Sequence, residues 1–147
     1  MIKFAGCIAI AVLALSVISF ADHTTLPELI ARADAAKPEE QPKLYMEIAE
    51  HEIKLADDAR KTDQTDEFVH QLQNVVTHSG KATSAALQTN KDVKKTELKI
   101  RRISHHLHEI EFDVDPDAQG AVQEAVNKLE SFRTSLLKKM FGGKAND

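Results

Sequence analysis

Three histidines and two glutamates lie close together and are the residues most suited to chemistry in this sequence: His105, His106, His108, Glu109 and Glu111. On a helix, His105, His108 and Glu109 would lie on one face, because residues three and four apart are neighbours there. Imidazole and carboxylate groups in such an arrangement can bind Zn²⁺ or Cu²⁺. These three residues are the metal-ligand candidates. A structural zinc site takes four ligands, and no second histidine pair has a matching spacing, so a solvated polar face is the competing interpretation.

A fourth histidine, His51, lies between Ile48 and Leu55 on the expected inner face of a helix, next to Glu52. A partly desolvated imidazole favours its neutral form. We therefore treat pH-dependent loosening of the hairpin formed by that helix and the next as a hypothesis, with a tolerated boundary residue as the alternative.

A basic segment precedes the histidine cluster. Its candidate partner-binding residues are Lys94, Lys95, Lys99, Arg101 and Arg102. One interpretation is a solvated helix face, and the other is a surface for an anionic partner such as a lipid headgroup, a surface polymer or an acidic protein. No aromatic residue is interleaved with these positions, and the chain carries a net charge of -4. Nucleic acid is therefore not the expected partner.

The sequence contains no recognisable nucleophile–base arrangement and no Gly-rich phosphate loop. We expect neither enzymatic activity nor a cofactor. The two functional hypotheses are an exported, non-enzymatic helical protein that binds another macromolecule or has a structural role in the envelope, and a metal- or pH-responsive histidine-containing periplasmic module.

The N-terminal residues 1–21 have the pattern of a secretory signal peptide. Lys3 precedes an apolar run, and the small residues Ser19 and Ala21 stand where a signal peptidase requires them. Cleavage would remove Cys7, the only cysteine, and would leave no membrane span. An uncleaved anchor is the alternative, because the apolar run approaches the length of a spanning helix. We expect the protein to be periplasmic or extracellular, with a single helical domain at 22–141 and a disordered tail at 142–147.

One apolar stripe along the chain would position the candidate histidine and basic residues on helices. It follows alternating spacings of four and three. Its members are Phe68, Leu72, Val75, Ser79, Ala82, Ala86, Thr89, Val93, Thr96, Ile100, Ile103, Leu107 and Ile110. Aromatic residues are only 5% of the chain, and Gly and Pro are few, which favours helix-on-helix packing over a β-sandwich.

The stripe predicts an all-α fold: an elongated antiparallel bundle with a long central helix at about 65–112. A helix at about 38–61 and another beginning at Pro116 would pack on its two halves, and a short helix opened by Thr25 and Glu28 would cover the middle. The alternative is an up-down four-helix bundle with a break near residue 90, where Asn90 could begin a new helix. Two observations favour continuity: the stripe keeps its register, and Lys94 and Lys95 would crowd a helix N-terminus.

The sequence also resembles a group of small exported bacterial proteins. The motifs are Pro42-Lys43-Leu44-Tyr45-x-x-Ile48-Ala49, Lys94-Lys95-Thr96-Glu97 through Arg101-Arg102, and Leu129-Glu130-x-x-Arg133-Thr134-x-Leu136-Leu137-x-x-Met140-Phe141. We know of no activity for that group, so the resemblance implies export and helical structure and nothing about function. The oligomeric state stays open, because Leu87, Leu98 and Leu137 could be scattered surface residues or a self-association face.

Overall fold

The computed structural model describes residues 24–142, and this part of the chain is helical with no strand. The five helices are α1 (Leu26–Ala35), α2 (Gln41–Lys61), α3 (Thr65–Thr89), α4 (Val93–Ile110) and α5 (Pro116–Phe141). The predicted all-α class is confirmed. The predicted signal peptide lies outside the described residues, as does all of the predicted tail except Gly142, which follows the end of α5.

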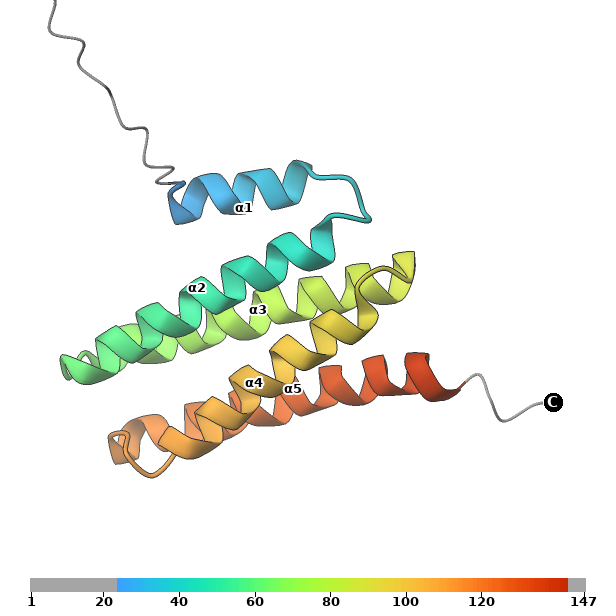
Figure 1. The fold of residues 1–147 in the computed structure, drawn as a ribbon. Helices are drawn as coiled ribbons and strands as arrows, with labels where there is room; N and C mark the ends of the chain where they lie inside the picture. The colour runs from blue at the N-terminus through green and yellow to red at the C-terminus, as the bar shows by residue number, and fades with distance from the viewer. Residues whose placement is uncertain (1–23, 143–147) are drawn as a thin grey trace, which may run out of the picture.

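Two antiparallel hairpins form the body of the molecule (Figure 1). Helices α2 and α3 make the first, α4 and α5 make the second, and the hairpins meet mainly where α3 packs on α5. Helix α1 lies along α2. Helices α2 and α4 run in the same direction and contact each other far less than the hairpin partners do. A shallow seam therefore separates α2 from α4.

The apolar stripe predicted from the sequence is the core of the structure. Its members Phe68, Leu72, Val75, Ser79, Ala82, Ala86, Val93, Thr96, Ile100, Ile103, Leu107 and Ile110 are buried. Thr89 alone is half-buried. Residues of α5 pack against the stripe as expected, with Val122, Leu129 and Leu136 fully buried.

The preferred prediction of one helix through 65–112 is wrong, and the alternative with a break near residue 90 is correct. Helix α3 ends at Thr89, and α4 begins at Val93. Asn90 and Asp92 adopt left-handed backbone conformations, with φ of 57° and 53°. Asn and Asp tolerate this conformation better than most residues, so both suit a sharp reversal. The unfavourable lysines at the start of α4 are partly offset, because Asp92 lies 3.2 Å from Lys95.

The starts of α1 and α5 follow the sequence signals, whereas α2 begins at Gln41, three residues later than expected. The N–H of Thr25 donates to the Glu28 carboxylate at 2.9 Å, as in a capping box. Asp115 precedes Pro116 at the start of α5 and accepts a long hydrogen bond of 3.4 Å from the N–H of Asp117. Both features satisfy amide groups that a helix N-terminus leaves without partners.

Substitutions at Asn90 distinguish the broken helix from a continuous one. In a left-handed position Asn90→Gly should keep the free energy of unfolding, whereas Asn90→Ala should lower it by about 1 kcal/mol. Inside a helix the order is reversed, because Ala is favoured over Gly by about 1 kcal/mol. Urea unfolding measures both. Exposed Ser84, within α3, is the control position, where Ala should be more stable than Gly. The same order at both positions would contradict the break.

Candidate functional site

The five basic residues singled out in the sequence divide into two groups on α4. Lys94, Arg101 and Arg102 are exposed and make no ion pair with any carboxylate that the structure describes. The other two are paired: Lys95 with Asp92, and Lys99 with Glu50 of α2 at 2.8 Å. Lys99 therefore helps to fasten α4 to α2. Lys94 and Arg101 leave positive charge on the outer side of α4, and Arg102 adds positive charge beside the seam with α2.

The seam between α2 and α4 forms a groove. One hollow of about 370 Å³ is lined by Ile53 and Lys54 of α2 and by Arg102 and Ile103 of α4, among others. At one end of it, Nε2 of His106 lies 2.9 Å from both carboxylate oxygens of Asp57, which gives a second bridge between the two helices. The groove thus has basic residues beside an apolar floor.

The predicted metal ligands lie on the exposed side of α4. His105 lies 3.5 Å from Glu109, and His108 lies 3.4 Å from Glu111, so each histidine has its own carboxylate. Within residues 24–142 the structure brings together no group of three His, Cys, Asp or Glu side chains that could hold a metal ion. Metal binding by His105, His108 and Glu109 stays a prediction, and it gains no support from this arrangement.

The prediction that His51 occupies the inner face of α2 is wrong. His51 is exposed, and its neighbour Glu52 takes the inner position with 1% of its surface accessible. Glu52 is balanced there by His78 of α3, which is 8% exposed and which the sequence analysis did not single out. Nδ1 of His78 lies 2.9 Å from both carboxylate oxygens of Glu52. The sequence contained one indication that His78 is buried, because His78 is adjacent to Ser79 of the apolar stripe.

This buried pair continues into a network that reaches α1. The Tyr45 ring stacks on His78, with centroids 6.2 Å apart, and its hydroxyl donates to Asp34 of α1 at 2.7 Å. Lys81 lies 3.5 Å from Asp34 and 5.3 Å from the centre of the Tyr45 ring. Burial, aided by the bond to Asp34, raises the pKa of Tyr45 to about 12. The same hydrogen bond lowers the pKa of Asp34. The network thereby fixes α1 to the first hairpin.

A second polar network joins α4 to α5. Arg133 donates to buried Glu97 at 3.1 Å and to Glu130 at 2.7 Å, and the Ser104 hydroxyl donates to Glu130 at 2.6 Å. Every charged member has a partner of opposite sign, so this network has a structural role and offers no free group for a ligand.

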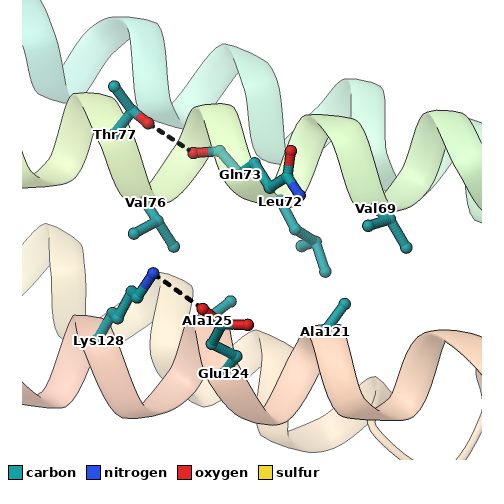
Figure 2. Close-up of a pocket in the computed structure, with 9 residues that line it drawn as sticks. All are labelled: Val69, Leu72, Gln73, Val76, Thr77, Ala121, Glu124, Ala125 and Lys128. Carbon is teal, nitrogen blue, oxygen red and sulfur yellow. Dashed lines mark hydrogen bonds and ion pairs between the residues drawn. The ribbon is translucent and has the colours of Figure 1, made fainter.

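A hollow of about 250 Å³ lies on the seam between α3 and α5 (Figure 2). Val69, Leu72 and Val76 of α3 face Ala121 and Ala125 of α5 across it. Its charged residues, Glu124 and Lys128, are 2.9 Å apart and neutralise each other. The hollow has no net charge, and nothing about it indicates a particular occupant.

Truncating the buried pair should be costly. Glu52→Leu leaves His78 without its carboxylate, and we expect the free energy of unfolding to fall by about 3 kcal/mol. The double variant Glu52→Leu/His78→Leu should lose less than the sum of the two single variants. The control is His51→Leu, adjacent in sequence but exposed, which should change stability by at most about 0.5 kcal/mol. Urea unfolding at neutral pH measures all four proteins. Equal losses for the Glu52 and His51 variants would contradict this assignment.

The raised pKa of Tyr45 gives a spectroscopic prediction. Tyr45 is the only tyrosine and the chain has no tryptophan, so tyrosinate absorbance reports this residue alone. The folded protein should titrate near pH 12 and the urea-unfolded chain near 10. Because folding holds this proton more tightly, its contribution to stability is complete below pH 10 and is lost as pH rises towards 12. Asp34→Asn should lower the folded midpoint, and a wild-type midpoint near 10 would contradict the network.

Within residues 24–142, no helix is long and apolar enough to cross a bilayer. Comparison with known proteins found no matching family model, curated protein or solved structure. The case for function therefore depends on the residues and contacts described above.

Proposed function

We propose that this protein is exported, has no catalytic activity and acts by binding an anionic macromolecule through α4. The observation that carries the proposal is the division of the basic residues. Lys99 is held by Glu50, whereas Lys94, Arg101 and Arg102 are exposed and have no carboxylate partner among the described residues. Three unpaired charges within three turns of one helix create a local positive potential that attracts anions.

Export is supported by the N-terminal sequence. A basic residue, an apolar run and small residues before a polar break favour secretion. In an exported protein the candidate partners include acidic envelope proteins and anionic surface polymers. The chain has a net charge of -4, so the positive charge of the basic face is opposite in sign to the charge of the whole molecule.

A second candidate is a module that responds to protons through its histidines. The observation that favours it is the interior pair of His78 and Glu52, a type of group that serves in pH-sensitive proteins. The two candidate functions predict different effects of acidic pH on partner binding. A proton-responsive module would gain or lose binding between pH 7.5 and 5.5 in a way that His78→Gln abolishes, whereas a constitutive binder would not.

Charge reversal of α4 tests the proposal. We expect the wild-type protein, immobilised at about 0.1 M salt, to capture anionic material from an envelope extract and to release it at about 0.5 M salt, because screening weakens exposed charge pairs. The variant Lys94→Glu/Lys95→Glu/Arg101→Glu/Arg102→Glu should lose most of that material. Recovery is quantified against the wild type, and the thermal unfolding of each protein is checked separately.

The matched control reverses four exposed lysines elsewhere, Lys61, Lys128, Lys138 and Lys139, which gives the same change in net charge. This variant should retain the captured material. Equal recovery by the α4 variant and the wild type would contradict binding through α4. Equal loss in both variants would show that net charge, and not the α4 face, determines capture.

A further inference from the structure

The groove between α2 and α4 is longer than a single hollow. The hollow of about 370 Å³ beside Ile53 and Ile103 is followed along the seam by a second one of about 150 Å³ beside Pro42 and Met46. Lys99 lines both hollows, and its bond to Glu50 crosses the seam. Residue numbers rise together along both walls, because α2 and α4 run in the same direction. From Asp92 to His106 the α4 wall measures about 21 Å, at about 1.5 Å per helical residue.

The walls of this groove are basic although the whole chain is acidic. Five basic residues line it (Lys43, Lys54, Lys95, Lys99 and Arg102), against two acidic ones, Glu50 and Asp92. Counting these seven gives a net charge of +3, in contrast to -4 for the chain. Lys54 and Arg102, from opposite walls, make no ion pair with any carboxylate in residues 24–142.

The floor of the larger hollow, which Lys54 and Arg102 both line, is apolar. Ile53 is half-buried and packs against the core, and Ile103 lies across the seam from it. Basic walls above an apolar floor complement a ligand that carries carboxylates and aliphatic side chains at short intervals. Such complementarity directs partner choice more than it sets affinity.

Resting on the proposed function, we infer that the occupant of this groove is an acidic peptide segment of a partner protein, about six residues long when extended. Its carboxylates bind Lys54 and Arg102, and its aliphatic side chains contact Ile53 and Ile103. A bilayer surface is flat and meets the outward residues Lys94 and Arg101 before it reaches the groove. The concave shape therefore favours a peptide over lipid headgroups.

The test uses a fluorescein-labelled peptide of alternating glutamate and leucine, eight residues long, with fluorescence anisotropy as the measurement. The groove variant is Lys54→Glu/Arg102→Glu. A comparison variant, Lys94→Glu/Arg101→Glu, makes the same change in net charge on the outer side of α4. The matched control, Lys138→Glu/Lys139→Glu, makes it at exposed positions of α5. We expect the groove variant to raise the Kd at least about tenfold, the comparison variant to raise it less than the groove variant does, and the α5 control to raise it less than about threefold. A glutamine–leucine peptide should bind at least about tenfold more weakly than the acidic one.

Three results would overturn the inference. Absence of acidic-peptide binding at about 100 μM protein would remove the peptide as occupant. A larger effect of the comparison variant than of the groove variant would move the site to the outer face of α4 and leave the proposed function intact. Binding to vesicles of phosphatidylcholine and phosphatidylglycerol, tighter than binding to the peptide and sensitive to the comparison variant, would identify a lipid surface instead.

Discussion

Helix α3 buries side chains on two sides, against α2 and against α5, and the rest of the structure depends on this double contact. Phe68, Leu72 and Val75 are almost completely removed from water. Each such side chain contributes about 1.5–3 kcal/mol relative to an exposed position. Because α5 must reach α3 to cover this surface, the second hairpin is held across the first. Helix α4 then takes the remaining position beside α2, where the two helices touch only lightly.

The polar networks give this apolar arrangement its specificity. Glu52 has to face His78, and Glu97 has to face Arg133, because a buried charge without its partner is strongly unfavourable. A shift of one helical turn within either hairpin would leave the buried acid of that hairpin unpaired. Apolar contacts alone distinguish such registers poorly, since similar aliphatic residues recur along the buried faces of the helices. The two networks therefore select one alignment of each hairpin.

The sequence predicted burial well and backbone path less well, for a physical reason. Ile100 and Leu107 were placed in the core because periodicity reports which side of a helix is apolar. The same periodicity passed unchanged through the reversal at Asn90, because the last residues of α3 and the first of α4 face one common core. Register is thus evidence for a shared core and not for an unbroken backbone. The left-handed preference of Asn90 was the better signal.

The site residues were harder to predict, because their surroundings come from distant parts of the chain. Neighbouring residues on a helix differ by about 100° in direction, so the apolar pattern of α2 could not decide whether His51 or Glu52 faces inward. The choice was made by His78, 26 residues further on. Likewise the groove needs α2 beside α4, two helices that no loop joins. Lys99 could be named as basic from the sequence, but its bond to Glu50 could not.

The reversal at residues 90–92 has one more consequence for the chain as a whole. Only those residues connect the two hairpins, and the apolar stripe keeps the same phase on both sides of them. If they straightened, α3 and α4 would become one rod with a continuous hydrophobic edge. The α4–α5 pair could then dock on the α2–α3 pair of another copy and recreate the same packing between molecules. The chain thus has the geometry for domain swapping, and the two left-handed residues favour closure within one molecule.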